Sequence, residues 1–120
     1  MKIDRNCKRY IAEYTEEAKE QLYGLHIEDR KKIVAAICAF EELGTDYKNI
    51  NNLGDGLYEV KPSGVRAYFM YDKKRKRIII VGFICLKKTQ EAPKRFMAQA
   101  RRNIQKYIIE MEKDNEKNNN

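Results

Sequence analysis

The stretch Ile78–Phe96, IIIVGFICLKKTQEAPKRF, determines most of the predicted fold. Its first nine residues, Ile78–Leu86, are apolar at both odd and even positions, interrupted only by Gly82. A strand with this pattern is covered on both faces, so we expect a central strand rather than an edge strand. Two lysines end the apolar run, and Pro93 suits the first turn of a helix. The stretch therefore predicts a buried strand, a short basic loop and a helix.

The segment from Phe96 onward has the pattern of an amphipathic helix. Its apolar residues recur at helical spacing: Phe96, Ala100, Ile104, Tyr107, Ile108 and Met111. Basic residues occupy other positions: Lys94, Arg95, Arg101, Arg102 and Lys106. Residues 112–120 are polar and cannot bury apolar area. We therefore expect a single domain over residues 1–111 and a disordered polar tail over residues 112–120.

Two shorter strand-like segments precede the apolar strand. They read LYEVK, from Leu57, and VRAYFMY, from Val65, and the turn sequence PSG separates them. A second turn, DKKRK, leads into the apolar strand. Short turns between strands indicate neighbouring antiparallel strands, so these segments predict a three-stranded antiparallel meander.

The N-terminal part predicts one strand and a helical hairpin. Residues 7–13 have a strand-like pattern, and Thr15 is a suitable N-cap for a helix that runs to about Gly24. A second helix is expected over Ile27–Leu43, with Gly44 ending it. The order strand, two helices, three strands and helix predicts an α+β fold, with the helices packed on a small, mostly antiparallel sheet.

Composition limits the class of protein. A chain of 120 residues suits one domain. The N-terminus is too polar for a signal peptide, and the longest apolar run of nine residues falls short of a membrane helix. The three cysteines, Cys7, Cys38 and Cys85, form no CxxC pair and have no metal-ligand spacing. We expect a soluble cytoplasmic protein with free buried thiols and no metal or cofactor.

Positive charge is concentrated in one part of the chain. Residues 61–106 contain fourteen Lys or Arg and only two acids, Asp72 and Glu91, so their net charge is +12. The remaining residues, with eleven bases and sixteen acids, have a net charge of −5. This separation indicates a polyanionic partner, most simply a nucleic acid.

Strand alternation and the PSG turn predict that five charged side chains converge on one concave patch: Glu59, Lys61, Arg66, Lys87 and Lys88. Cations can hold a phosphate, and one acid could take the proton of a 2′-hydroxyl group. The simpler alternative is a cross-strand ion pair between Glu59 and a Lys or Arg. Spacing alone favours that alternative.

Two segments together resemble a known family. GLYEVKPSGVRAYFMY, residues 56–71, and GFICLKKTQEAPKRFMAQARR, residues 82–102, resemble the RelE/ParE toxin superfamily, most closely its HigB-like, phage-derived branch. The resemblance implies a RelE-like fold and the toxin of a type II toxin–antitoxin system. It implies a ribosome-dependent, metal-independent mRNA endoribonuclease (an mRNA interferase) that cleaves by attack of the 2′-oxygen on the adjacent phosphate. The implied partners are the ribosome, mRNA and a helix-turn-helix antitoxin of the HigA type.

The resemblance also implies roles for particular residues. Arg66 would stabilise the developing phosphorane-like charge, Lys87 with Lys88 would bind phosphate and protonate the leaving group, and Glu59 would be the base. RNA contacts are expected from six side chains: Lys61, Lys88, Tyr68, Arg95, Arg101 and Arg102. Tyr68 could stack on a base. The only histidine, His26, lies in the helical hairpin, far from the patch.

Two other functions are compatible with the same features. ParE-like relatives act on DNA gyrase without being nucleases. A protein that binds RNA or the ribosome without cleavage would also carry this charge.

Overall fold

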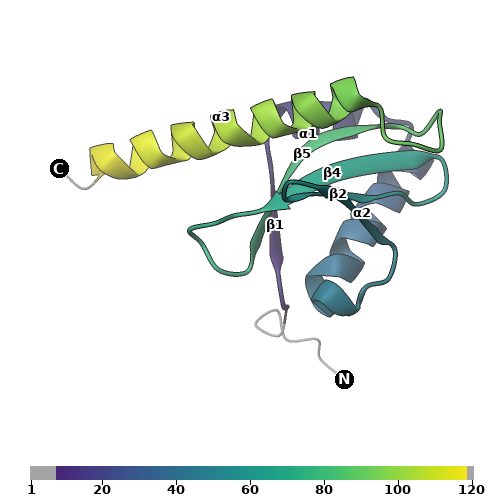
Figure 1. Ribbon diagram of the computed structural model, residues 1–120, viewed down its shortest axis with the longest axis horizontal. Helices are drawn as coiled ribbons and strands as arrows, with labels where there is room; N and C mark the ends of the chain where they lie inside the picture. Colours follow the sequence, from purple (N-terminus) through teal and green to yellow (C-terminus); the bar gives the residue numbers. More distant parts are fainter. Residues whose placement is uncertain (1–7, 119–120) are drawn as a thin grey trace.

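A computed structural model describes residues 8–118 (Figure 1). Its helices and strands follow in this order: β1 (Ile11–Tyr14), α1 (Glu16–Gly24), α2 (Ile27–Leu43), a short 3-10 helix (Gly44–Asp46), β2 (Ile50–Gly54), β3 (Leu57–Val60), β4 (Val65–Tyr71), β5 (Ile78–Leu86) and α3 (Lys94–Asn118). The predicted α+β class, helical hairpin, meander and C-terminal helix are confirmed.

The sheet has the strand order β1-β5-β4-β3-β2. β1 pairs with β5 in parallel, and the other neighbours are antiparallel. The apolar strand β5 therefore lies inside the sheet, as expected from its sequence. In β4, alternate residues face opposite layers: Phe69 packs with α1 and α2, whereas Tyr68 packs with α3. Figure 1 shows α3 crossing the sheet and continuing beyond it.

Two boundaries and one additional strand differ from the expectations. β1 begins at Ile11 rather than at residue 7, and Cys7 lies outside the described residues. β2 was not expected, because its sequence INNLG is polar and turn-like; it is an edge strand with a bulge between Asn52 and Gly54. α3 continues to Asn118, so residues 112–118 are helical where a disordered tail was expected. An ion pair of 2.6 Å between Lys74 and Glu112 ties this end of the helix to the β4–β5 turn.

Thr15 and Gly44 act as the sequence predicts. The Thr15 hydroxyl accepts a hydrogen bond from the Ala18 backbone N–H and caps α1. Gly44 ends α2 with a φ of 58°, a conformation that favours glycine. Cys38 is exposed and Cys85 is half-buried, so the expectation of buried thiols was wrong for Cys38. Within residues 8–118, no helix has the length and apolar character needed to cross a bilayer, and no cluster of three potential metal ligands occurs.

Gly82 allows α3 to pack closely on β5. A Cβ atom at this position would lie 2.8 Å from the Ala100 carbonyl oxygen and 2.6 Å from Cγ1 of Ile104. The Asn103 side chain donates a hydrogen bond of 2.9 Å to the Gly82 carbonyl, which fixes the register of the helix over the strand. These contacts fix the position of α3 on β5, and the position of the first turn of the helix follows from them.

We expect Gly82→Ala to lower the free energy of unfolding by about 1–3 kcal/mol, because the added methyl group overpacks a backbone contact. Gly24→Ala is the matched control, since a Cβ at Gly24 meets nothing within 4 Å. That change should leave the stability unchanged or raise it by up to about 1 kcal/mol. Urea denaturation of the three proteins measures the difference; equal stability of Gly82→Ala and wild type would contradict the close packing.

A partly buried charge cluster joins β1, the β4–β5 turn and α3. Arg75 donates two hydrogen bonds to the Glu13 carboxylate, at 2.9 and 2.8 Å, and one of 2.8 Å to Asp72. Tyr107 donates to Glu13 at 2.5 Å. The Arg75 hydrogen bonds lower the pKa of Glu13. Burial acts to raise the pKa of Asp72, but hydrogen bonds from the Lys74 backbone and from Arg75 outweigh it and lower this pKa.

A carboxylate with a lowered pKa stabilises the fold above its unfolded pKa of roughly 4 and loses that contribution as the pH falls. We therefore expect Arg75→Gln to destabilise the protein clearly at pH 7 and much less at about pH 3. Denaturation at both pH values measures the effect. The control Lys31→Gln removes only an exposed 3.9 Å pair with Glu28 and should change little at either pH. An equal loss of unfolding free energy for Arg75→Gln at both pH values would contradict the proposed link between the lowered pKa values and stability.

Candidate functional site

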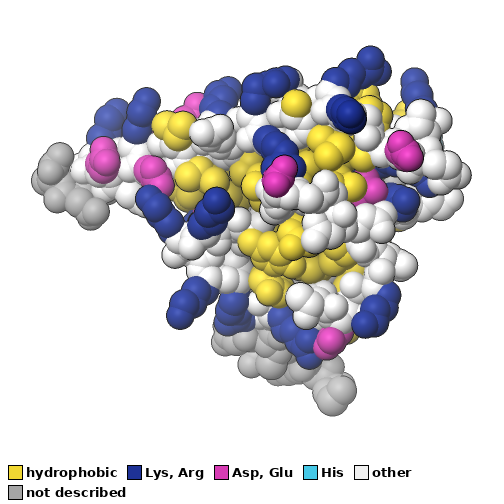
Figure 2. Space-filling model, viewed as in Figure 1, with side chains coloured by type: hydrophobic (Ala, Val, Ile, Leu, Met, Phe, Trp, Pro, Cys, Tyr) yellow, Lys and Arg dark blue, Asp and Glu magenta, His cyan; other side chains and the backbone are white. Residues whose placement is uncertain are grey.

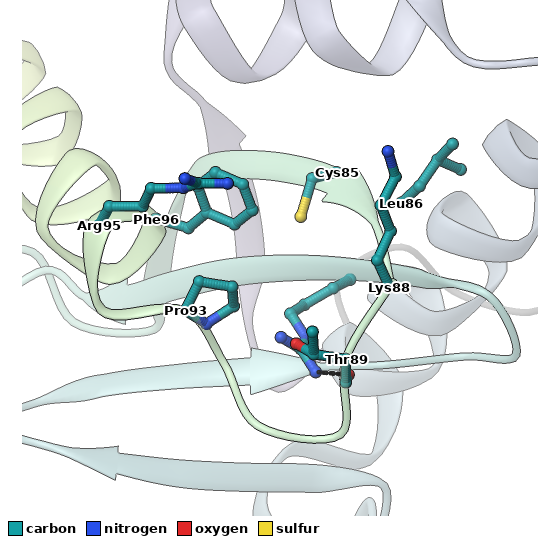
Figure 3. A pocket seen from close by; sticks show the side chains of 8 residues that line it. Cys85, Leu86, Lys88, Thr89, Pro93, Arg95 and Phe96 are labelled. Carbon is teal, nitrogen blue, oxygen red and sulfur yellow. Dashed lines mark hydrogen bonds between the residues drawn. The ribbon is translucent and has the colours of Figure 1, made fainter.

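A cavity of about 340 Å³ lies where β5 ends, between the loop of residues 87–93 and the first turn of α3 (Figure 3). Eight residues line it: Arg66, Cys85, Leu86, Lys88, Thr89, Pro93, Arg95 and Phe96. Three of these are cations, and among the described residues no acidic side chain belongs to the lining. The loop of residues 87–93 is called the 87–93 loop below.

Arg66, on β4, lies at the base of this cavity and is only 1% exposed. One of its amino groups, Nη2, donates to the backbone oxygens of Thr89 and Gln90, at 3.1 and 3.2 Å. The other, Nη1, donates to the backbone oxygen of Glu91 at 3.1 Å and to the Tyr68 hydroxyl at 3.5 Å. The dashed line in Figure 3 marks the contact with Thr89. The guanidinium group thus fixes the 87–93 loop to the sheet.

The charge of Arg66 is balanced by Glu59 on the neighbouring strand β3. Arg66 Nε and Glu59 Oε2 are 3.0 Å apart, although the contact is not aligned as a hydrogen bond. Glu59 is 2% exposed, and its other oxygen accepts a hydrogen bond of 3.1 Å from the Asn51 side chain. The cross-strand ion pair, which spacing alone favoured, is therefore present. Glu59 is buried and is not among the residues that line the cavity, where a base would be needed.

Tyr68 does not offer a stacking surface. Its side chain is 0% exposed and packs between the sheet and α3, and burial raises the pKa of its hydroxyl. The expectation that Tyr68 could stack on a base is wrong for this structure. Its hydroxyl group instead accepts a hydrogen bond from Arg66.

The lysines expected at the patch separate into two groups. Lys88 is exposed and lines the cavity. The Lys87 backbone N–H donates to the Gly64 carbonyl at 2.9 Å, which places the end of β5 beside the turn before β4, as predicted. The Lys87 ammonium group donates to the side-chain oxygen of Gln90 at 3.5 Å. Lys61 is half-buried and does not line the cavity.

The three arginines of α3 also differ in their contacts, and only one of them lines the cavity. Arg95 is exposed and lines the cavity. Arg101 donates to the backbone oxygens of Gly54 and Asp55, at 2.9 and 2.8 Å, and so holds the β2–β3 turn. Arg102, the next residue, is exposed and donates to the Gln99 side chain. Figure 2 shows Lys and Arg side chains distributed along the whole of α3.

Sequence reasoning missed the aromatic wall of the cavity. Phe96 stacks on Phe83, with ring centroids 5.0 Å apart and planes inclined by 27°, and the Arg95 guanidinium lies 4.9 Å from the Phe96 ring centre. Cys85 contributes a half-buried thiol whose pKa is raised by burial. The available signal was the position of Phe96 at the start of the apolar helix face, directly after the basic loop. His26, by contrast, caps α2 and is remote in sequence from every lining residue.

Similarity to a known protein family identifies the class of this chain. Residues 20–105 match the family of phage-derived Gp49-like proteins (DUF891), so the chain belongs to that family. The recognition of the RelE/ParE superfamily, in its phage-derived branch, is thereby confirmed.

One solved structure with a similar chain is the toxin–antitoxin complex RelBE2 from Mycobacterium tuberculosis. The match has 16% identity and a TM-score of 0.49, and it covers 66% of this chain and 99% of that one. Among curated proteins, no sequence matches this chain.

The Arg66–Glu59 pair gives a stability prediction. Arg66→Met leaves a buried carboxylate without its counter-ion and should cost about 3–5 kcal/mol of unfolding free energy. Arg66→Met combined with Glu59→Leu removes both charges and should recover a large part of that loss, since an apolar pair of similar volume is often tolerated. Urea denaturation of the single and double variants measures the coupling; a double variant no more stable than Arg66→Met would refute it.

Proposed function

We propose that this protein is the toxin of a type II toxin–antitoxin system and acts as a ribosome-dependent mRNA endoribonuclease. The observation that carries the proposal is the cavity at the end of β5, which gathers Arg66, Lys88 and Arg95 with no acid among the described lining residues. Such a site attracts an anionic group that fits into a small cavity, and a phosphate of an RNA strand meets that description. Membership of the phage-derived family and the +12 charge of residues 61–106 support the same conclusion.

The proposed reaction needs no metal. The 2′-oxygen of a nucleotide attacks the adjacent phosphorus, the bond to the 5′-oxygen of the next nucleotide breaks, and a 2′,3′-cyclic phosphate and a 5′-hydroxyl result. Lys88, with Lys87 beside it, holds the phosphate and supplies the proton to the leaving 5′-oxygen. Among the described residues, the lining contains neither carboxylate nor histidine. The acceptor of the 2′-hydroxyl proton therefore comes from outside the lining, which accords with a reaction that needs the ribosome.

Arg66 can take part in this reaction only if its hydrogen bonds to the 87–93 loop break. To stabilise the phosphorane-like charge, it must exchange the backbone oxygens of the 87–93 loop for phosphate oxygens. Glu59 then acts as its counter-ion and positioning residue rather than as the base. The partners in this proposal are mRNA on the ribosome and, as inhibitor, a cognate antitoxin of the helix-turn-helix type, all in the cytoplasm.

The closed arrangement of Arg66 favours a second candidate function. With each amino group of Arg66 bonded to the protein, the exposed cations Lys88 and Arg95 can still bind RNA. Arg66 itself then has no amino group free to stabilise the charge of a transition state. A toxin that binds RNA or the ribosome and blocks translation without cleavage would need no opening of the loop.

The deciding experiment maps mRNA 5′ ends in a translating extract with and without the protein. Wild-type protein should create new 5′ ends only when ribosomes are present, and Lys88→Ala should reduce them at least tenfold through lost phosphate contact. Lys76→Ala is the control, because Lys76 is an exposed lysine on the distant β4–β5 turn. This variant should cleave mRNA like the wild-type protein. Lys88 is the residue of choice because it is exposed, whereas replacement of Arg66 also disturbs the fold.

Two results would change the conclusion. Translation that stops while mRNA stays intact would support the non-cleaving candidate and reject the nuclease. Unaffected translation with blocked DNA replication would reject both and point to gyrase.

A further inference from the structure

Half of the residues that line the cavity are apolar or aromatic. Cys85, Leu86 and Pro93 line it together with Phe96, whose ring is fixed by stacking on Phe83 (Figure 3). A site for phosphate alone needs no such wall. Aromatic rings and guanidinium planes at the edge of a basic groove are the groups on which proteins stack unpaired bases.

The cations stand on opposite sides of this apolar surface. Lys88 comes from the 87–93 loop and Arg95 from the first turn of α3, and Figure 3 shows their side chains on either side of the opening. Both are exposed, so they meet a ligand as it enters. The Arg95 guanidinium also lies over the Phe96 ring, 4.9 Å from its centre, so its plane and the ring form one surface on which a base can stack.

The size of the cavity limits the ligand. A volume of about 340 Å³ lies at the lower end of the range for small-molecule sites, roughly 300–1,000 Å³. One nucleotide fits such a space, whereas a duplex does not enter it. The ligand must also be anionic at its edge and flat and apolar at its centre.

We propose that the cavity binds a single unpaired nucleotide of RNA, with its base against Phe96 and its phosphate between Lys88 and Arg95. This inference rests on the proposed function, in that it assigns the substrate contact of the same site. It does not require Arg66, whose amino groups remain bonded to the 87–93 loop. Binding of the nucleotide is thereby separable from cleavage.

The test is an NMR titration of the full chain, without ribosomes, with adenosine 5′-monophosphate, uridine 5′-monophosphate and ribose 5-phosphate. Both nucleotides should shift amide signals of residues 85–96 in a saturable way. Ribose 5-phosphate should bind roughly tenfold more weakly, because it lacks the stacked base.

Two pairs of variants separate the contacts. Phe96→Leu should weaken nucleotide binding about tenfold and leave ribose 5-phosphate unchanged, since it removes only the stacking surface. Its control is Met97→Leu, at a neighbouring position that packs toward the sheet and does not line the cavity. Arg95→Gln should weaken both ligands, whereas Lys94→Gln, its exposed neighbour outside the lining, should weaken neither.

The outcomes distinguish this inference from the proposed function. Equal binding of ribose 5-phosphate and nucleotides, or a Phe96→Leu effect matched by Met97→Leu, would reduce the site to a phosphate site and overturn the base contact. The absence of saturable shifts would overturn the inference even if the extract shows cleavage. Nucleotide binding that depends on Phe96 would support it even if the extract shows no cleavage.

Discussion

The buried guanidinium of Arg66 is the interaction on which the loop and the cavity depend. A charge that is 1% exposed is stable only when it is balanced and hydrogen-bonded. Glu59 supplies the opposite charge from β3, and three consecutive carbonyls of the 87–93 loop supply acceptors. The loop has no strand or helix of its own, so these bonds define its path. Lys88 and Pro93 therefore lie where they do because of a residue on another strand.

This arrangement makes the two roles of Arg66 compete. A guanidinium group has five N–H donors in one plane, and those of its two amino groups already meet protein oxygens. A phosphate that enters must replace carbonyl acceptors with charged oxygens, which is a favourable exchange because a guanidinium can bind a phosphate through two parallel hydrogen bonds between opposite charges. The exchange also releases the loop that carries Lys88. Structural stability in the closed form and charge stabilisation in a reaction thus draw on the same donors.

The sequence predicted the parts of the fold that follow from local pattern. The apolar run of β5, the Thr15 cap and the glycine stop at Gly44 each have a direct physical signal, and each is present. β2 was missed because it is a short edge strand in which two asparagines and a glycine make up most of the five residues, a composition typical of turns. The length of α3 was missed because its last turns are helical while largely exposed, and the contacts from Lys74 to Glu112 and from Tyr107 to Glu13 join residues far apart in sequence.

The candidate site was predictable only in its charges. Strand alternation placed Glu59 near Arg66 and left two interpretations open, and the structure contains the ion pair. The partners of Arg66 in the loop could not be read from sequence, because a backbone carbonyl belongs to every residue. The same holds for Phe96, which the helical pattern assigns to an apolar face without indicating that its ring lines a cavity.

The pairing of Glu59 with Arg66 also decides where the positive field of the cavity arises. Two opposite charges 3.0 Å apart largely cancel beyond their own neighbourhood, so Arg66 adds little to the attraction of a distant anion. That attraction falls to exposed cations, of which Lys88 and Arg95 are the ones at the opening. Their interaction with a phosphate is screened by salt and indifferent to base sequence. Any preference for an unpaired base must then come from the uncharged wall formed by Phe96 and its neighbours, and not from the basic residues that first draw attention in the sequence.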